Sequence, residues 1–173
     1  MPVDLKSFIR DVPDFPKPGI VFKDITPLLL DAAAFTRAVA GMAEPFRGAG
    51  ITKVVAIESR GFLFGGPIAV RLATGLVPVR KPGKLPSLRG RVEYALEYGT
   101  DALEMHSDAL GPEDRVLVVD DVLATGGTAR AAGELVRRHG AELSGFSFLV
   151  DLAFLGGRAR LERARVEALL RYA

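Results

Sequence analysis

Two adjacent carboxylates and a loop rich in glycine and threonine follow one another in residues 116–128, Val-Leu-Val-Val-Asp-Asp-Val-Leu-Ala-Thr-Gly-Gly-Thr. Glycines let backbone N–H groups approach an anion closely, and the N-terminus of a following helix adds partial positive charge. The hydroxyls of Thr125 and Thr128 can donate hydrogen bonds to phosphate oxygens. The loop lacks the Lys-Ser/Thr ending of a Walker loop. We therefore predict a phosphate site of another kind, formed by Ala124, Thr125, Gly126, Gly127 and Thr128.

The carboxylates of Asp120 and Asp121 need a different partner, since they would repel a phosphate placed beside them. The hydroxyls of a ribose fit, because carboxylates accept hydrogen bonds from a diol. We interpret the segment as a site for a ribose 5-phosphate, with the aspartates on the sugar and residues 124–128 on the phosphate. The alternative is a solvated strand end followed by a tight turn and a helix cap. Either piece alone favours that alternative, whereas the ordered combination after a buried strand favours the ligand site.

A second candidate is the basic stretch from residue 80 to residue 91, which contains no acid. Its cations are Arg80, Lys81, Lys84, Arg89 and Arg91. Prolines and glycines within it disfavour regular structure. A flexible basic loop opposite a phosphate site could close over a pyrophosphate. The alternative is a solvated surface loop.

Short apolar runs must position these side chains. Four runs are long enough for buried strands and too short for helices, at residues 54–57, 77–79, 116–119 and 146–152. Helices are expected over residues 62–74, closed by Gly75, and over about 128–139, capped by Gly140. Strands that alternate with helices predict a parallel α/β sheet, in which ligands bind at the carboxyl ends of the strands.

The remaining segments are assigned from turn, cap and charge patterns. Residues 11–19 contain four Pro or Gly residues, which predicts an extended or turning segment rather than a helix. Asp31 is expected to cap a helix, and residues 92–105 alternate as in a hairpin. The arginines of residues 158–165 are interspersed with glutamates, which predicts a solvated helical face, with an interface as the alternative.

Composition limits the classes of function. A length of 173 residues favours one domain, and the absence of cysteine excludes disulfides, thiolate nucleophiles and cysteine metal sites. The two histidines, His106 and His139, offer little for a zinc site. A formal net charge of +2 is too small to indicate nucleic-acid binding, and no apolar run approaches the ~18 residues that cross a bilayer. With no signal-peptide pattern at the N-terminus, we expect a cytoplasmic protein without nucleic-acid or membrane partners.

Residues 116–128 resemble the phosphoribosyl pyrophosphate motif of the type I phosphoribosyltransferases, and their Ala-Thr-Gly-Gly-Thr ending is similar to that of the adenine phosphoribosyltransferases. Further segments resemble this family in the same order and extend the match over nearly the whole chain. Residues 15–28 resemble its base-binding hood, 58–65 its pyrophosphate loop, and 80–86 and 96–99 the two ends of its mobile catalytic loop.

The resemblance implies an α/β type I phosphoribosyltransferase fold in a single domain, residues 1–173, with a central, mainly parallel sheet flanked by helices. A base-binding hood would lie within residues 1–30 and a mobile catalytic loop over 81–97. The implied reaction converts adenine and phosphoribosyl pyrophosphate to AMP and pyrophosphate, as in purine salvage. Mg²⁺ would be the cofactor, held by phosphoribosyl pyrophosphate and water without a direct protein ligand. A homodimer is also implied.

The resemblance assigns roles to single residues. Glu97 would reach N7 of adenine as a general acid, and Phe22 would stack on the purine opposite Leu123. Backbone groups near Val21 would bind the exocyclic amine. Lys23 lies beside them, but its side chain is not expected to select the base, because Lys cannot form a planar fork. The pyrophosphate would be bound by Ser59, Arg60, Lys81 and Lys84, of which the last three are also expected to be catalytic.

Two alternatives remain open. The first is the same chemistry on another 6-substituted purine, since base choice depends on a few contacts in the hood. The second is a regulator that senses phosphoribosyl pyrophosphate without catalysis. Retention of Glu97 and of the basic loop argues against a sensor, and 173 residues leave no room for an added DNA-binding domain.

Overall fold

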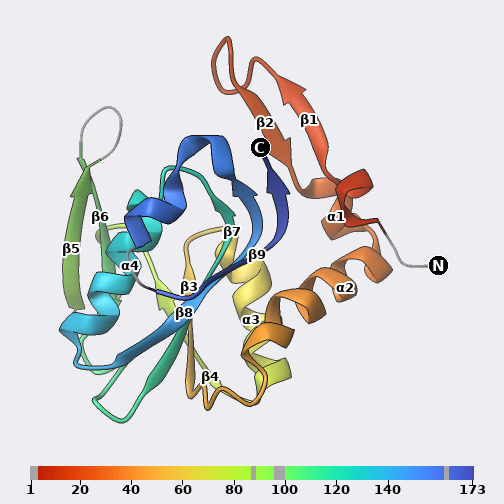
Figure 1. The fold of residues 1–173 in the computed structure, drawn as a ribbon. Helices are drawn as coiled ribbons and strands as arrows, with labels where there is room; N and C mark the ends of the chain where they lie inside the picture. The colour runs from red at the N-terminus through yellow and green to blue at the C-terminus, as the bar shows by residue number, and fades with distance from the viewer. Residues whose placement is uncertain (1–3, 87–88, 96–99, 162–163) are drawn as a thin grey trace.

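The computed structural model describes residues 4–86, 89–95, 100–161 and 164–173. Its centre is a five-stranded sheet in the order β4-β3-β7-β8-β9, in which every neighbouring pair is parallel (Figure 1). The strands are β3 (Lys53–Ile57), β4 (Gly75–Val79), β7 (Arg115–Leu123), β8 (Glu142–Leu152) and β9 (Val166–Tyr172). The predicted parallel α/β sheet is confirmed, and β9 is a strand that sequence patterns did not indicate.

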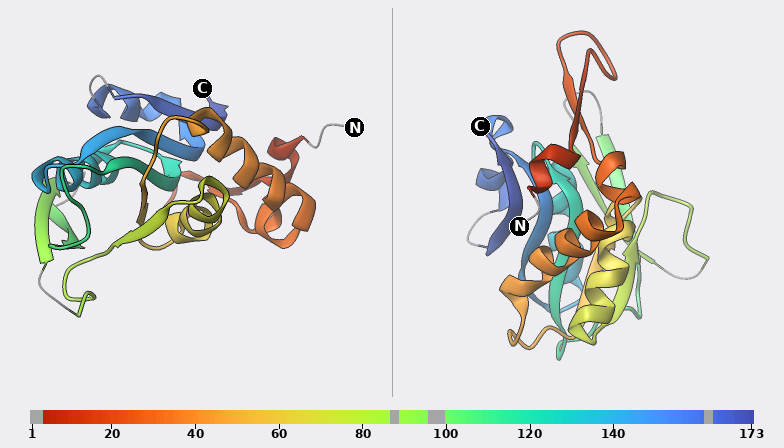
Figure 2. Two further views of the ribbon diagram at one scale, coloured as in Figure 1. Left: turned by 90° about the horizontal axis from the view of Figure 1, so that it is seen from below. Right: turned by 90° about the vertical axis from the view of Figure 1, so that its right-hand side faces the viewer.

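Helices cover both faces of the sheet, which explains why its central strands are apolar without alternation (Figure 2). On one face, α2 (Ala32–Ala43) and α3 (Gly61–Leu72) share a core with Leu117. On the other face, α4 (Gly127–Arg138) shares a core with Val118. Because successive side chains of a strand point to opposite faces, β7 is held from both sides and its carboxyl end is fixed in place.

Two predicted helix ends are confirmed. The Asp31 carboxylate accepts a hydrogen bond from the Ala34 amide at 2.8 Å and caps α2. Gly140 follows α4 in the left-handed region, with φ of 81°, and donates its N–H to the Arg137 carbonyl. None of the helices in the described part of the chain is long and apolar enough to span a bilayer.

An antiparallel pair, β1 (Arg10–Pro13) and β2 (Val21–Asp24), projects beyond the carboxyl ends of the central strands (Figure 1). A short helix, α1 (Thr26–Leu30), follows it. The expectation of an extended or turning segment over residues 11–19 is confirmed. Strand β2 therefore lies where ligands bind in a parallel α/β sheet.

A second antiparallel pair consists of β5 (Arg89–Ala95) and β6 (Thr100–His106), as predicted for residues 92–105. Leu103 of β6 is buried in the same core as α4. A bridge between Arg80 and Glu104 joins this hairpin to the residue that follows β4. The basic stretch therefore leaves the central sheet at its edge and runs to the hairpin.

The predicted closure of a helix by Gly75 is wrong. Helix α3 ends at Leu72, and Ala73 adopts the left-handed conformation with φ of 54°. Gly75 begins β4, where it pairs with Lys53 of β3. Pairing of the edge strand β4 with β3 thus outweighs the preference of glycine for the end of a helix.

The predicted solvated helical face over residues 158–165 is confirmed only in part, because Arg158, Arg160 and Arg165 are exposed but no α-helix carries them. The chain forms two short 3₁₀ helices, Ala153–Leu155 and Gly157–Leu161, and then enters β9. Gly156, with φ of 67°, separates the two turns. Pairing of β9 with β8 outweighs the helix preference of Glu, Ala, Leu and Arg in residues 166–172. Arg163 lies outside the described residues.

Candidate active site

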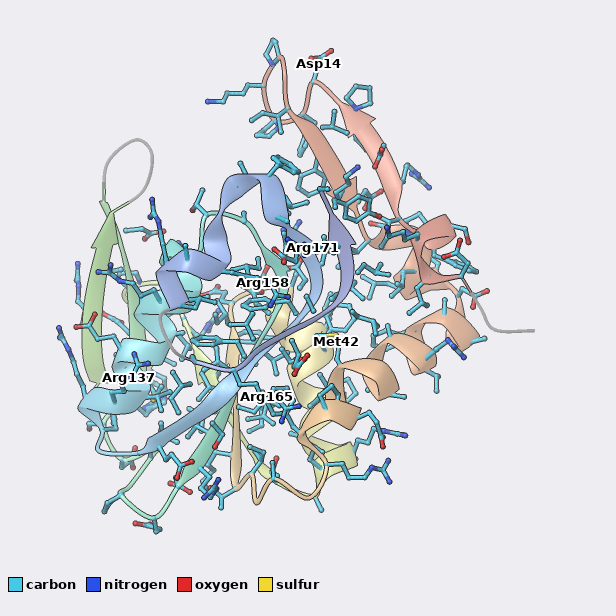
Figure 3. The ribbon with its side chains drawn as sticks, viewed as in Figure 1. Asp14, Met42, Arg137, Arg158, Arg165 and Arg171 are labelled. Carbon is cyan, nitrogen blue, oxygen red and sulfur yellow. The ribbon has the colours of Figure 1, made fainter. Side chains whose placement is uncertain are left out.

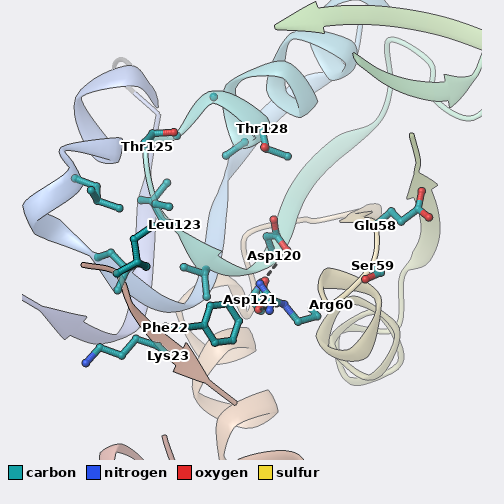
Figure 4. Close-up of a pocket in the computed structure, with 18 of the residues that line it drawn as sticks. Phe22, Lys23, Glu58, Ser59, Arg60, Asp120, Asp121, Leu123, Thr125 and Thr128 are labelled. Atoms are coloured by element: carbon teal, nitrogen blue, oxygen red, sulfur yellow. Dashed lines mark hydrogen bonds and ion pairs between the residues drawn. The ribbon is translucent and has the colours of Figure 1, made fainter. Parts of the chain in front are cut away.

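A cavity of about 580 Å³ opens at the carboxyl ends of β3 and β7 (Figure 4). Four parts of the chain line it: residues 20–23 of the hood, residues 58–60 with Lys81, residues 120–129, and Leu152 with Leu155. The first three contain most of the predicted site residues. The last was not predicted, because a leucine at the end of a strand or in the turn that follows it carries no signal of a ligand.

The predicted phosphate loop forms one wall of this cavity, and all of residues 124–128 line it. Gly126 is the N-cap of α4 and has φ of 83°, a conformation that favours glycine. Gly127 and Thr128 begin the helix, so the loop meets the positive end of the helix dipole. This arrangement suits a phosphate, because α4 is 12 residues long and its first amides lack helical partners.

Asp120 and Asp121 follow the four buried aliphatic residues of β7, shortly before this loop. The side chain of Asp121 is 5% exposed, and its Oδ2 lies 2.7 Å from Arg60 Nε. Asp120 Oδ1 accepts a hydrogen bond from the Asp121 amide at 2.9 Å. Burial, and then the neighbouring Asp121 carboxylate, raise the pKa of Asp120 well above its usual range, although Arg60 acts in the opposite direction. Asp120 therefore holds its proton to higher pH than an ordinary aspartate.

Arg60 lies between Asp121 of β7 and Phe22 of β2. Its guanidinium carbon lies 5.2 Å from the centre of the Phe22 ring, while its Nε faces Asp121. Figure 4 shows these three side chains gathered on one side of the cavity. A group that stacks on Phe22 would therefore lie close to a ribose held by the aspartates.

Lys23 differs from the other hood residues that line the cavity in the direction of its side chain. Val21, Phe22 and Lys23 all line the cavity together with Leu123. The Lys23 ammonium, however, points away from it, lying 2.6 Å from Asp11 Oδ1 and 4.3 Å from the centre of the Tyr172 ring (Figure 4). Lys23 therefore ties the hood to the C-terminal strand β9.

Glu58 is a site residue that sequence reasoning missed. Its carboxylate accepts hydrogen bonds from Lys84 Nζ at 2.6 Å, from the Lys81 amide at 2.9 Å and from Arg80 Nη2 at 3.2 Å. Burial opposes ionisation, but these donors outweigh it and lower the pKa of Glu58 to about 2. The available signal was an acid between a buried strand and Ser59-Arg60.

The first three cations of the basic stretch, Arg80, Lys81 and Lys84, are thus held by acids in this structure. Lys84 pairs with Glu58, and the Lys81 ammonium forms an ion pair with Asp101. Lys81 lines the cavity together with Ser59 and Arg60, whereas Lys84 is not among the lining residues. Glu97 lies outside the described residues.

Comparisons with known proteins show the family to which the chain belongs. Residues 28–162 match the family described as "Phosphoribosyl transferase domain". The "Adenine phosphoribosyltransferase" of Myxococcus xanthus is 60% identical over 98% of this chain and 92% of that protein. The protein of the same name from Anaeromyxobacter dehalogenans strain 2CP-1 is 58% identical over 97% of this chain and 98% of that protein.

Solved structures of adenine phosphoribosyltransferases are also similar to this chain. The adenine phosphoribosyltransferase of Thermoanaerobacter pseudethanolicus superposes with a TM-score of 0.95 at 49% identity, covering 98% of both chains. The Saccharomyces cerevisiae enzyme, "complexed with" adenine and an imino-altritol bisphosphate, has a TM-score of 0.91 at 41% identity, covering 96% of this chain and 97% of that one. Fold and cavity together are those of a type I phosphoribosyltransferase. Within that class, the chain belongs to the adenine phosphoribosyltransferase family.

Proposed function

We propose that this cavity carries out the reaction of the family, in which adenine and phosphoribosyl pyrophosphate give AMP and pyrophosphate. The observation that carries the proposal is that one cavity is lined by the aspartate pair, the whole of residues 124–128 and the Phe22 ring. In the reaction, the bond from C1′ to pyrophosphate breaks while N9 of adenine bonds to C1′ and loses its proton. Holding both reactants in one cavity removes much of the entropic barrier to that step.

The sugar phosphate would be held by the end of β7 and the loop that follows it. Residues 124–128 would bind the 5-phosphate through backbone amides and the hydroxyls of Thr125 and Thr128. Asp120 and Asp121 would accept hydrogen bonds from the ribose hydroxyls. Arg60, now paired with Asp121, would turn to the incoming phosphates, and the ribose would replace it on the carboxylate.

Adenine would stack on Phe22 opposite Leu123, with backbone groups near Val21 on its exocyclic amine. Phe22 is already fixed edge-on against Phe15, with ring centroids 5.2 Å apart, which supports a preformed platform. Glu97 would donate a proton at N7 while N9 releases its own proton to the pyrophosphate oxygens, and it would take that proton back once N9 has bonded to C1′, so that AMP leaves with a neutral base. Lys23 would act through the position of the hood, because its ammonium is engaged by Asp11 and Tyr172.

Pyrophosphate would be bound by Ser59, Arg60, Lys81 and Lys84. For the two lysines this requires that the anion compete with Asp101 and Glu58, which now hold them. Mg²⁺ would enter with phosphoribosyl pyrophosphate, held by its oxygens and water, and would neutralise charge on the leaving group. The chemistry of the cavity fits this, because the Asp121 and Glu58 carboxylates already face cations.

At the scale of the chain, we propose one phosphoribosyltransferase domain over residues 1–173, with a hood in 1–30 and a catalytic loop over 81–97. We further propose a homodimer formed through the outer face of α3. Leu63 and Val70 of that helix are 43% and 82% exposed, and Leu76 of β4, which lies near Gly65 of the same helix, is 47% exposed. A cytoplasmic location stays a prediction from the sequence.

The test is pyrophosphate release with Mg²⁺, phosphoribosyl pyrophosphate and each of adenine, hypoxanthine, guanine and xanthine. Turnover with adenine alone is expected. Turnover with another base would keep the chemistry and overturn the assignment of the hood. Binding of phosphoribosyl pyrophosphate without turnover of any base would make the protein a sensor.

A further inference from the structure

The segment that connects β8 to β9 lies directly against the phosphate loop. A Cβ atom added to Gly126 would lie 2.5 Å from the Gly157 carbonyl oxygen. Conversely, a Cβ atom added to Gly157 would collide with the Ala124 carbonyl. The two backbones therefore touch with no side chain between them, so the position of Gly157 sets how far residues 124–126 can move.

The residue after Gly157 anchors this segment. Arg158 Nε donates a hydrogen bond to Asp151 Oδ2 at 2.6 Å, and its Nη1 donates to the Val166 carbonyl at 2.8 Å. Asp151, near the end of β8, is fully buried, whereas Arg158 is 42% exposed. Figure 3 shows Arg158 at the strands β8 and β9, whereas Arg137 lies on α4. One guanidinium thus joins β8, the connecting segment and β9.

The ion pair between Asp151 and Arg158 should have a fixed geometry. A fully buried carboxylate requires a charged partner, and in the described parts of the chain Arg158 is the residue that pairs with it. The guanidinium is a planar fork, so its two hydrogen bonds fix direction as well as distance. A side chain held at two points in this way holds the adjacent Gly157 in place as well.

We propose that Asp151 and Arg158 are positioning residues for the sugar-phosphate site. They act through Gly157, which supports residues 124–126 from behind, and neither residue is among those that line the cavity. The inference rests on the proposed binding of the 5-phosphate by residues 124–128. It assigns to the connecting segment a role in the affinity for phosphoribosyl pyrophosphate and none in the recognition of adenine.

The test compares Arg158→Met with Arg160→Met by calorimetric titration of ribose 5-phosphate, together with steady-state kinetics and thermal unfolding. Arg160 is a matched control, because it lies in the same turn, is exposed and has no ion pair with a described residue. For Arg158→Met we expect the Kd of ribose 5-phosphate and the KM of phosphoribosyl pyrophosphate to rise roughly tenfold, since small misplacements of binding groups have large effects. The KM of adenine should change less than about twofold.

Two further variants separate positioning from folding. Arg158→Lys keeps the charge beside Asp151 and should partly restore the affinity for ribose 5-phosphate. Gly157→Ala leaves the ion pair intact but pushes on Ala124, and should raise the same Kd. Folded Arg158→Met and Gly157→Ala variants with unchanged Kd would overturn the proposal, as would equal losses of affinity for ribose 5-phosphate and adenine.

Thr128→Ala distinguishes failure of this inference from failure of the proposed function. If Thr128→Ala weakens ribose 5-phosphate binding and Arg158→Met does not, only the positioning role is wrong. If neither variant changes the binding, the assignment of the phosphate to residues 124–128 is wrong, and the inference is lost with it.

Discussion

Two partly buried acids at the cavity have pKa values that move in opposite directions. Burial disfavours the charge on both Glu58 and Asp120. Glu58 receives three hydrogen-bond donors, whereas Asp120 has the Asp121 carboxylate next to it. Glu58 is therefore a fixed anion that orders the base of the basic loop. Asp120 is an acid of the cavity that keeps its proton to higher pH than an ordinary aspartate.

The Glu58 carboxylate should stabilise the fold in a pH-dependent way. Its pKa falls from 4.5 to about 2 on folding, so its contribution is complete above pH 4.5 and is lost as the pH falls towards 2. We expect Glu58→Gln to lower the free energy of unfolding by about 2 kcal/mol at pH 7, and by much less near pH 3. Urea unfolding at both pH values measures this, with Glu134→Gln on the surface of α4 as the control. A loss of equal size at both pH values would contradict the account.

Glu97 is the proposed general acid. Glu97→Gln keeps the shape of the side chain and removes its proton, so kcat should fall by roughly 10²–10⁴ while both KM values stay near those of the wild type. Steady-state kinetics measures kcat and KM, and Glu113→Gln is the control variant, because Glu113 is an acid in a turn away from the cavity. An unchanged kcat would remove Glu97 from the mechanism.

Asp121 is the proposed ribose ligand. Asp121→Asn should raise the Kd of phosphoribosyl pyrophosphate about 10- to 100-fold, because a charged hydrogen-bond acceptor is lost in a buried position. Adenine affinity should change little. Equilibrium binding of each substrate alone measures both values, and wild-type affinity for phosphoribosyl pyrophosphate would be incompatible with this assignment.

At the scale of elements, the hood is positioned by its contact with the C-terminal strand. Lys23 bridges Asp11 of β1 and Tyr172 of β9. We expect Lys23→Met to raise the KM of adenine a few-fold, on the order of the ~1 kcal/mol lost with such a contact, without changing the order of preference among purines. Kinetics with four purine bases tests this, and a changed order of preference would mean that Lys23 contacts the base.

Buried strands could be predicted from the sequence because their apolar runs are continuous, as in residues 116–119 of β7. The loop over residues 124–128 and its place before a helix could be predicted too, since its residues are contiguous in the chain. Strand β9 could not, because its helix-favouring residues are outweighed by pairing with β8. The hydrogen-bond partners of Glu58 and Arg158 could not be predicted either. The fold brings each of these residues to its partners, and Arg80, for example, lies 22 residues from Glu58 in the sequence.

At the scale of the whole molecule, the apolar outer face of α3 should be covered by a second copy. Val70 is 82% exposed, so Val70→Asp is tolerated in a monomer and places a charge in the proposed interface. Sedimentation equilibrium should show a dimer for the wild type and a monomer for Val70→Asp. Arg37→Asp, on the neighbouring helix α2, is the control. A monomeric wild type would contradict the proposed assembly.

We propose that one cavity holds the phosphate on residues 124–128, the ribose on Asp120 and Asp121, and the base on Phe22. A crystal structure with AMP bound is the decisive experiment. We expect the phosphate within hydrogen-bond distance of the loop amides, the ribose hydroxyls on the aspartates and adenine stacked on Phe22. AMP bound elsewhere, or in this cavity with its base at residues 124–128, would show that the proposed site is wrong.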